Sequence, residues 1–592
     1  MDKQSISRTA TAPKDYGALL LPSLAILATV AVALLVIYRR GPSNGHDFVF
    51  HLTSWMDALD SWRQGNLYPQ WAASANFGAG EPRFVYYPPL TWMAGAALGA
   101  VMPWQWVPLA LTALILALCG LAAFCFAREW LPREAATLTA VLFIANPYFI
   151  FNAYERTAYG ELTGAAFLPL ILLFAVGERT SLLGLTLSVA GVWFTNAPAA
   201  LMASYLLLFV GIFSSFWNRS WNPLVRAVEG GAVGAGLAGL YLVPAIRLQR
   251  WVDIRQALDD GMRIRDSWLF EHTGQWFHDA VLRTASWIAV CVLGAGLLAA
   301  LLLWLLERRK QQLPMKLRPI FDCAVVVLCG ITLLQFPVSA MVWRLPKLEF
   351  LQFPWRWILV ASLLTSLLLS ALCYRLGVLR RWFAWVLILG MVSVVAIHCE
   401  RHFYQFSDDD DAVSTQVEQH QTGVGVAGTD EYTAMEANND IMQMGMPVAR
   451  VLLSARDETA RAMPLLADGN MQYPQWKADT KREIPARVRV LQWTSEEHLL
   501  SIQSEEPGWA VLRLREFPAW RVTVNGRPAK LAHRADGLLA VAVGKDRAQI
   551  AVNWQRPMAG WVGLGLSLAS LGVLLLLLAL RRTSQAFERG VQ

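Results

Sequence analysis

Charged residues are scarce in this chain. Only 16% of its 592 residues are Asp, Glu, Lys or Arg, whereas 55% are hydrophobic. A soluble globular domain usually has roughly a quarter charged residues. The apolar residues also come in blocks of about 17–25 residues, the length at which a helix crosses a bilayer. The composition therefore argues against a soluble protein and indicates an α-helical polytopic membrane protein.

Cysteines are also few, and none of them lies in a long loop. All seven fall in or at the edge of apolar blocks. They are Cys119, Cys125, Cys291, Cys323, Cys329, Cys373 and Cys399. The sequence therefore predicts neither a disulfide framework nor a cysteine metal site.

Nucleotide-binding signatures are missing as well. The chain has no G-x-x-x-x-G-K-[ST] loop and no dinucleotide-binding glycine fingerprint. We therefore expect no nucleotide cofactor. If the protein handles a phosphate group, a lipid-linked phosphate fits a membrane-embedded site better than a cytoplasmic nucleotide.

Apolar blocks are what the sequence has in quantity. We expect helices at 17–38, 105–127, 134–152, 161–177, 226–245, 283–306, 319–338, 356–374, 382–399 and 560–580. The stretch 181–215 is too long for one span, and Thr195-Asn196-Ala197-Pro198 interrupts it, so two helices are expected there. The total is about 12 spans. The first block is too long for a cleavable signal peptide and is expected to be retained.

Lysine and arginine in short loops predict the orientation, because cytoplasmic loops are enriched in them. One alternation of the spans puts seven segments, with 19 of the 51 Lys and Arg residues, in the cytoplasm. They are 1–16, 128–133, 177–181, 216–226, 307–318, 375–382 and 581–592. Both termini are then cytoplasmic. Topology accounts for the net charge of +7, so a nucleic-acid partner is not expected.

Three large segments remain for the outer face: 39–104, 246–282 and 400–558. In the first, the apolar stretch Pro88 to Val101 is only about 14 residues long, and we expect it to lie on the membrane or dip partly into it. The third is expected to be a soluble domain inserted before the last helix. From about Ala486 it alternates like β-strands, and Asn525-Gly526 is a hairpin signal, so an antiparallel β-sandwich is expected.

The first outer segment has the most unusual polar residues. Gly45-His46-Asp47 lies within one turn of the end of a membrane helix, and His51 follows at a spacing that could share a helical face with Asp47. A carboxylate at the bilayer surface could take a proton from a sugar hydroxyl, alone or through a metal. The alternative is structural: Asp47 as a helix cap, with His46 and His51 as interfacial polar residues.

Two further clusters flank apolar blocks. Tyr154-Glu155-Arg156 and Glu161 join the third and fourth helices, where ionisable groups pair or face a cavity. Lys347 precedes Phe353-Pro354-Trp355-Arg356, and the guanidinium fork of Arg356 suits a phosphate. The alternatives are a structural ion network for the first cluster and an aromatic belt with one arginine anchor for the second.

In their order along the chain, these elements resemble the GT-C superfamily of membrane glycosyltransferases. The resemblance is to the bacterial multi-pass proteins labelled "6-pyruvoyl-tetrahydropterin synthase-related", which are similar to lipoteichoic-acid-glycosylating enzymes; the label implies no pterin chemistry. It spans nearly the whole chain. Besides the residues above, it rests on Tyr68-Pro69-Gln70-Trp71, Tyr87-Pro88-Pro89-Leu90, Asp430-Glu431-Tyr432 and Phe517-Pro518-Ala519-Trp520.

The resemblance implies an inverting transferase of the bacterial cytoplasmic (inner) membrane. It implies a polyprenyl-phosphate sugar donor, a glycan or lipid acceptor on the extracytoplasmic face, and a GT-C-like domain over 1–399. By position Asp47 would be the base or a metal-linked acid, and Glu155 or Glu161 a second acid. Arg356, Arg156, Arg83 and Lys347 are the phosphate-binding candidates, and His46, His51 and Tyr87 complete the first-loop set. A divalent cation, with Asp47 as ligand, stays open.

A transporter or flippase of a lipid-linked glycan is the alternative, since about 12 spans is a common number for one. Transporters usually bind substrate near the midplane, between related halves with broken helices. The sequence has no evident repeat of two halves, and its polar clusters lie at helix ends. The pattern therefore favours the transferase, with the extracytoplasmic domain at 400–558 and the last helix and cytoplasmic tail at 559–592.

Overall fold

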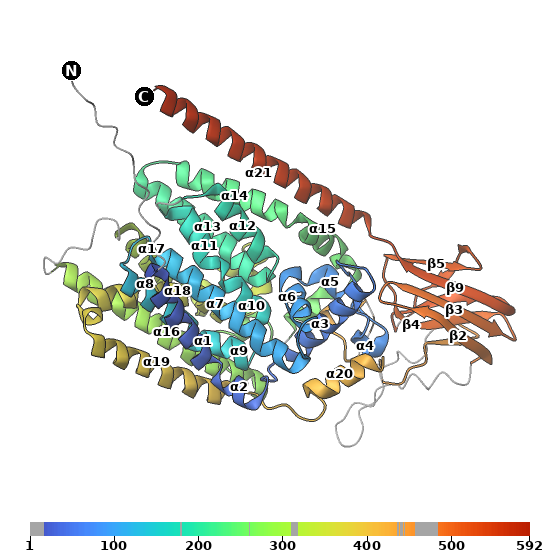
Figure 1. Ribbon diagram of the computed structural model, residues 1–592. Helices are drawn as coiled ribbons and strands as arrows, with labels where there is room; N and C mark the ends of the chain where they lie inside the picture. The colour runs from blue at the N-terminus through green and yellow to red at the C-terminus, as the bar shows by residue number, and fades with distance from the viewer. Residues whose placement is uncertain are drawn as a thin grey trace.

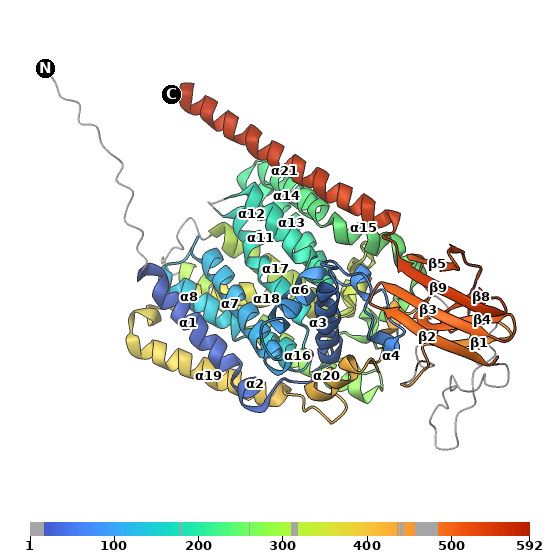
Figure 2. The same cartoon turned by 45° about the vertical axis from the view of Figure 1, so that its right-hand side comes forward.

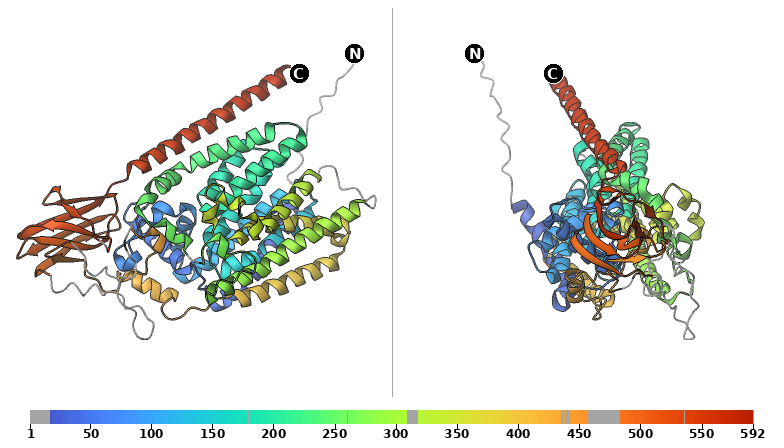
Figure 3. Two further views of the ribbon diagram at one scale, coloured as in Figure 1. Left: turned by 180° about the vertical axis from the view of Figure 1, so that it is seen from behind. Right: turned by 90° about the vertical axis from the view of Figure 1, so that its right-hand side faces the viewer.

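The computed structural model describes residues 17–177, 180–259, 261–308, 318–434, 437, 442, 444–455, 483–534 and 536–591. Its helices form one elongated bundle, and the β-strands stand together at one end of it (Figure 1). The rear view and the end-on view in Figure 3 give the same arrangement. The predicted cytoplasmic segment 1–16 and most of the basic loop 307–318 lie outside the described residues.

Eight helical segments of the described chain are long and apolar enough to cross a membrane. They are built by α7 (Val107–Ala127), α8 with α9 (Arg133–Ile144 and Pro147–Tyr154), α10 with α11 (Tyr159–Ala165 and Phe167–Val176), α13 (Ala197–Asn218), α16 (Trp276–Arg308), α18 (Ile358–Arg375), α19 (Trp382–Phe403) and α21 (Met558–Val591). The number is nine if a bent pair, α14 (Asn222–Leu237) and α15 (Gly239–Leu248), counts as one span; the bend is 73°.

The expected total of about 12 spans exceeds this number, because several helices are shorter than their apolar blocks. The block 17–38 is split into α1 (Gly17–Ala33) and α2 (Leu35–Arg40). Two other predicted spans are α12 (Leu182–Trp193), with 12 residues, and α17 (Arg318–Leu334), with 17. Two shorter apolar helices, in α1 and α12, bring the described chain to at most eleven apolar segments, so the predicted number of about 12 spans is not confirmed.

The interruption at 195–198 has the predicted effect. The side chain of Asn196 accepts a hydrogen bond of 2.9 Å from the backbone N–H of Ala199, and Pro198 lies in the first turn of α13. An asparagine cap followed by proline starts a helix, because both satisfy or remove N–H groups that have no helical partner. The prediction of two helices is confirmed.

Burial separates central from peripheral helices. In the span Pro354–Arg375, which contains α18, 83% of the most apolar stretch of residues is buried inside the protein. In α19 and α21 the buried share of the corresponding stretch is 11% and 17%. Large apolar side chains such as Leu387, Met391 and Leu575 are exposed on these outer helices. Long apolar helices with exposed faces are stable in lipid and unfavourable in water. The chain is an integral membrane protein.

The first inter-helix segment forms a small helical layer of α3 (Phe48–Arg63), α4 (Ala75–Gly78), α5 (Arg83–Tyr86) and α6 (Pro89–Gly99). α6 packs on α3 so closely that a Cβ on Gly95 would lie 2.4 Å from the Trp55 ring. With 11 residues, α6 is about 16 Å long, against a hydrocarbon thickness of about 30 Å. It is too short to span.

Two antiparallel sheets lie between α19 and α21, in the orders β1-β4-β8-β7 and β2-β3-β9-β5-β6. Their strands are β1 (Ala449–Leu452), β2 (Ala486–Trp493), β3 (Glu497–Ser504), β4 (Gly508–Arg515), β5 (Trp520–Val524), β6 (Arg527–Pro528), β7 (Leu531–Ala532), β8 (Leu538–Val543) and β9 (Asp546–Trp554). One apolar cluster joins the sheets, with Leu512 and Val541 from the first and Leu500 and Ile550 from the second.

The Asn525-Gly526 hairpin is confirmed. Both residues have positive φ, 51° and 76°, which a two-residue turn between β5 and β6 requires.

The domain formed by the two sheets contacts the helical layer through aromatic rings. Trp71 lies with its ring centroid 5.1 Å from that of Trp520 and 5.5 Å from that of Trp554. The Tyr68–Trp71 and Phe517–Trp520 elements therefore meet in space.

The connection from α19 to the sheets wraps around the helical layer. α20 (Val413–Gln421) lies along α3, as Figure 2 also shows. The chain then pairs with the first segment, where Val426 donates to the Ser74 carbonyl at 2.9 Å. Further on, Asp253 donates to the Thr433 carbonyl at 3.0 Å. Residues 425–434 are thus held between two segments that are far away in sequence.

Candidate active site

A short backbone pairing brings the first two predicted clusters together. The N–H groups of His46 and Asp47 donate to the carbonyls of Glu155 and Arg156, each at 3.0 Å. Gly45 permits this approach, because a Cβ there would lie 2.4 Å from the Glu155 carbonyl oxygen. The loop that opens with Asp47 is therefore positioned directly by the loop between α9 and α10.

Two buried arginines share one carboxylate at this place. Arg156 forms an ion pair of 2.8 Å with Glu161, and Arg356 approaches the same Glu161 oxygen at 3.6 Å. Tyr148 donates to the other Glu161 oxygen at 2.6 Å. All three charged side chains are less than a tenth exposed. The trio has a formal charge of +1, which is unfavourable in a buried place without a further anion.

Arg356 has unused hydrogen-bonding capacity. Its Nε and Nη1 are buried and have no hydrogen-bond partner in the described chain. Two stacked rings support the guanidinium groups: Arg356 lies 5.1 Å from the Phe353 ring centroid, and Arg156 lies 5.0 Å from that of Trp355. Fixed, unpaired guanidinium N–H groups are suited to bind an oxyanion.

Asp47 is a carboxylate without a side-chain partner in the described residues. It occupies the cap position of α3, but its side chain makes no capping hydrogen bond. Burial raises its pKa above the ordinary value, although the neighbouring Arg156 and Arg356 oppose the shift. A carboxylate of raised pKa is a stronger base than one free in water. The geometry therefore leaves Asp47 free to accept a proton.

The other first-loop candidates surround Asp47 with rings. His51 is 1% exposed, and burial, with Arg83 adding to it, lowers its pKa to about 3, so it is neutral. The His51 ring is edge-on to the Tyr87 ring, with the two ring centroids 5.7 Å apart. Burial and the Asp47 charge raise the pKa of Tyr87, which keeps its hydroxyl protonated. His46 is exposed, and its ring centroid lies 5.3 Å from that of Phe277.

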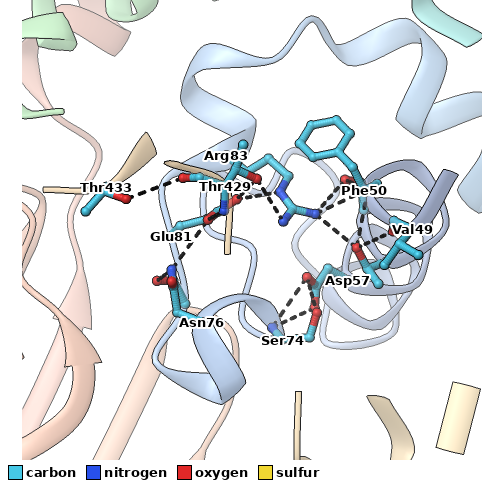
Figure 4. A network of polar contacts seen from close by, with 12 residues as sticks. Val49, Phe50, Asp57, Ser74, Asn76, Glu81, Arg83, Thr429 and Thr433 are labelled. Carbon is cyan, nitrogen blue, oxygen red and sulfur yellow. Dashed lines mark hydrogen bonds and ion pairs between the residues drawn. The ribbon is translucent and has the colours of Figure 1, made fainter. Parts of the chain in front are cut away.

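Three candidates lie outside this cluster of contacts. Arg83 donates to Glu81 at 2.7 Å and to Ser54 at 2.9 Å in a separate buried network (Figure 4). Lys347 is exposed, with its ammonium 5.1 Å from the Phe350 ring centroid. Glu155 is partly buried and its carboxylate has no hydrogen bond to a described residue; burial raises its pKa to about 7.

No role was predicted for Glu431 from the sequence. Nearby, Thr429 donates from its N–H and its hydroxyl to Glu81 at 2.8 and 2.9 Å (Figure 4). The Tyr432 ring stacks on Tyr86 with a centroid distance of 5.7 Å. Burial raises the pKa of Glu431 to about 7, and the charges of Glu81 and Asp47 act in the same direction. The sequence signal was the element Asp430-Glu431-Tyr432, to which the family resemblance assigned no role.

The residues around Asp47 do not fit a divalent cation. No group of three or more His, Cys, Asp or Glu side chains in the described chain is arranged to hold a metal ion. The Asp47 carboxylate is also beside two guanidinium groups, which repel a cation and favour an anion.

Comparison with known proteins found no match to a protein-family model and no match among curated proteins. Solved structures gave distant likenesses. The apo oligosaccharyltransferase of Archaeoglobus fulgidus has a TM-score of 0.39 and 11% identity, over 67% of this chain and 57% of that one. The A. fulgidus oligosaccharyltransferase AglB with an inhibitory peptide and a dolichol-phosphate has 0.35 and 15%, over 71% and 57%.

ArnT from Cupriavidus metallidurans bound to undecaprenyl phosphate has a TM-score of 0.27 and 13% identity, over 72% of this chain and 92% of that one. At TM-scores below 0.5, such likenesses establish neither a shared fold nor a shared activity. The chain also spans little more than half the length of the archaeal oligosaccharyltransferase chains that it matches.

Proposed function

We propose that this protein is a membrane glycosyltransferase of the GT-C type. It transfers a sugar from a polyprenyl-phosphate donor to a cell-envelope glycan or lipid acceptor. By the predicted topology, the reaction takes place on the extracytoplasmic face of a bacterial cytoplasmic membrane. Asp47 is the base, and Arg356 with Arg156 holds the donor phosphate.

One observation carries this proposal: the Asp47 carboxylate lies near two buried arginines, and Arg356 has two nitrogens without a hydrogen-bond partner in the described chain, although its Nε approaches Glu161 at 3.6 Å. A transferase that uses a sugar phosphate needs both parts. The base accepts the proton of the acceptor hydroxyl, and the guanidinium groups stabilise the phosphate that leaves. A flippase of a lipid-linked glycan would also bind the phosphate through arginines, but it would not need the base.

An apolar groove next to the arginines suits a lipid-linked donor. It runs between α13 and α17 and is lined by Trp343, Leu348 and Trp357, of which Trp357 directly follows Arg356 in sequence. Apolar side chains of this groove, such as Phe209 and Val326, are exposed. A polyprenyl chain can lie in the groove while its phosphate meets Arg356.

The reaction is a single displacement. The Asp47 carboxylate takes the proton of an acceptor hydroxyl, and the acceptor oxygen attacks the anomeric carbon of the sugar. The bond between that carbon and the phosphate oxygen breaks, and its electron pair leaves with the polyprenyl phosphate. The new glycosidic bond has the inverted configuration. Glu161 is a positioning residue in this scheme, because its carboxylate orients Arg156 and Arg356.

The test is a transfer assay with purified protein and a panel of polyprenyl-phosphate hexoses labelled with tritium. Asp47→Asn is expected to lower kcat at least about a hundredfold, since a general base contributes about 10²–10⁴-fold. Arg356→Gln is expected to raise the donor KM. Asp409→Asn, in the exposed acidic run, is the matched control.

Full activity of Asp47→Asn would refute the assigned base. The alternative of a flippase is tested in liposomes with the same labelled lipids. Movement of the labelled lipid between leaflets, without a new glycosidic bond in any assay, would refute the transferase.

A further inference from the structure

A second polar hollow lies where α3, α20 and the two sheets meet. It is a small hollow with a volume of about 160 Å³, and it is open to solvent. Its lining includes Asp60 of α3 and Gln64 directly after that helix, His420 of α20, Trp493 of β2, Ser495 between β2 and β3, and Arg513 of β4. None of these residues takes part in the site around Asp47.

The acidic groups of the hollow already have partners. Asp60 accepts from His420 at 2.9 Å and pairs with Arg63 at 3.1 Å. Asp57 accepts from the Ser74 hydroxyl at 2.7 Å, and His420 lies 3.9 Å from its other oxygen. Their charges are therefore compensated inside the protein.

Arg513 is different. It donates from Nη1 to the Met446 carbonyl at 3.3 Å, but it forms no ion pair with a described residue, and its Nε is buried without a hydrogen-bond partner. Burial lowers its pKa, and no neighbouring carboxylate opposes that shift. A partly buried guanidinium without a counter-charge is unfavourable unless an anion reaches it.

Aromatic and hydroxyl-binding groups complete the hollow. Trp493 is partly exposed at the end of β2, with its ring 4.2 Å from the His498 ring, which holds it in place. The Gln64 side-chain oxygen accepts from Ser495, so the Gln64 amide is oriented. An indole face beside fixed polar groups matches the apolar face and the hydroxyl groups of a sugar ring.

We propose that this hollow binds a sugar unit of the acceptor glycan that carries an anionic group, with the anion on Arg513 and the sugar ring on Trp493. The inference rests on the proposed transferase function. α3 links the two sites: Asp47 immediately precedes it and Asp60 lies 13 residues further, a distance of about 20 Å along the helix. The bound unit is thus several sugars away from the reacting hydroxyl.

The experiment measures binding of two fluorescein-labelled trisaccharides to the full-length protein in detergent by fluorescence polarisation. The probes are tri-galacturonate, which is acidic, and maltotriose, which is neutral. Tri-galacturonate is expected to bind saturably and at least about tenfold more tightly than maltotriose at low salt. Arg513→Gln should remove this difference, and Trp493→Ala should weaken the binding of both probes.

Matched controls are Arg489→Gln, exposed on β2 outside the hollow, and Trp509→Ala on β4. Arg513→Lys keeps the charge and should retain part of the preference, which separates loss of the anion site from misfolding. The proposal is overturned if tri-galacturonate does not bind, if both probes bind equally, or if Arg513→Gln behaves like Arg489→Gln.

Asp47→Asn distinguishes this inference from the proposed reaction. It should abolish transfer and leave tri-galacturonate binding unchanged. If the wild-type protein transfers no sugar but still binds tri-galacturonate through Arg513, the binding site stands and the transferase falls.

Discussion

The Glu161 carboxylate is shared by two guanidinium groups, those of Arg156 and Arg356. Because all three are buried, solvent cannot compensate the extra positive charge well. Asp47 lies within electrostatic reach of this trio without pairing with it. At the residue scale, the site is an anion-binding position with a base at its edge, and any further negative charge near it should weaken donor binding.

Glu431 provides such a charge in a pH-dependent manner. Burial, together with the charges of Glu81, Asp47 and Asp430, raises its pKa to about 7, so its carboxyl is neutral below that pH and negative above it. We expect the donor KM of the wild-type protein to rise about threefold to tenfold from pH 6 to pH 8.5, since a new negative charge repels the donor phosphate. Glu431→Gln stays neutral and should keep the low KM at pH 8.5.

Glu155 offers the control for this measurement. Burial raises its pKa to about 7 as well, but no charged residue of the site contributes to that shift. Glu155→Gln should therefore keep the wild-type rise in donor KM. An unchanged pH profile in Glu431→Gln would contradict the assigned influence of Glu431.

At the element scale, His420 provides a polar link from α20 to Asp57 and Asp60 of α3. Burial and the charge of Arg63 lower the pKa of His420. The hydrogen bond to Asp60 and the negative charges of Asp57 and Asp60 raise it by more, so the pKa of His420 is raised above its ordinary value of 6.5. Protonated His420 is thus favoured in the folded protein. This contribution to stability is complete below pH 6.5 and is lost as the pH rises through the folded-state pKa.

We therefore expect His420→Gln to lower the thermal unfolding midpoint at pH 6 but to match the wild type near pH 9. The loss at pH 6 should be about 1 kcal/mol, since a hydrogen bond between charged groups contributes about 1.5–3 kcal/mol and solvent at the exposed side of Asp60 reduces it. His402→Gln, at the exposed end of α19, is the control. A gap between wild type and His420→Gln that does not change with pH would contradict this account.

The elements that could be predicted are those with local causes. The break at Asn196 and the Asn525-Gly526 turn were predicted, because a helix cap and a hairpin turn depend on two or three neighbouring residues. β1 was not predicted, since it has only four residues and is defined by its pairing with β4, about 60 residues later. The short helices inside apolar blocks were missed because an apolar pattern does not mark where a helix breaks.

The same reasoning applies to the site. Asp47, Arg156 and Arg356 could be proposed because charged residues at the ends of apolar helices are unusual. Arg83 has a similar sequence context, but its partners include Thr429, 346 residues away, so its buried network could not be predicted. The position of Glu431 depends on long-range contacts of its neighbours: Thr429 bonds to Glu81, and Tyr432 stacks on Tyr86.

At the scale of the whole molecule, the sheets and α3 lie next to each other at one end of the helical bundle (Figure 1). Trp71 connects the sheets to the first segment through its contact with Trp520. The backbone hydrogen bond from the Asp47 N–H to the Arg156 carbonyl connects that segment to the bundle. Both proposed binding sites are therefore connected to the sheets. The distribution of lysine and arginine predicts that they lie on the extracytoplasmic side of the membrane.

Cysteine labelling in intact cells tests this topology. Ser407 is exposed between α19 and α20, and Asn218 is exposed in the loop predicted to be cytoplasmic. With the seven native cysteines replaced by serine or alanine, Ser407→Cys should react with a membrane-impermeant maleimide in intact cells, because it is on the outer side. Asn218→Cys should react only after the cells are permeabilised. The opposite labelling pattern would put the arginine site in the cytoplasm, where the envelope acceptor is absent, and would refute the proposed reaction together with the topology.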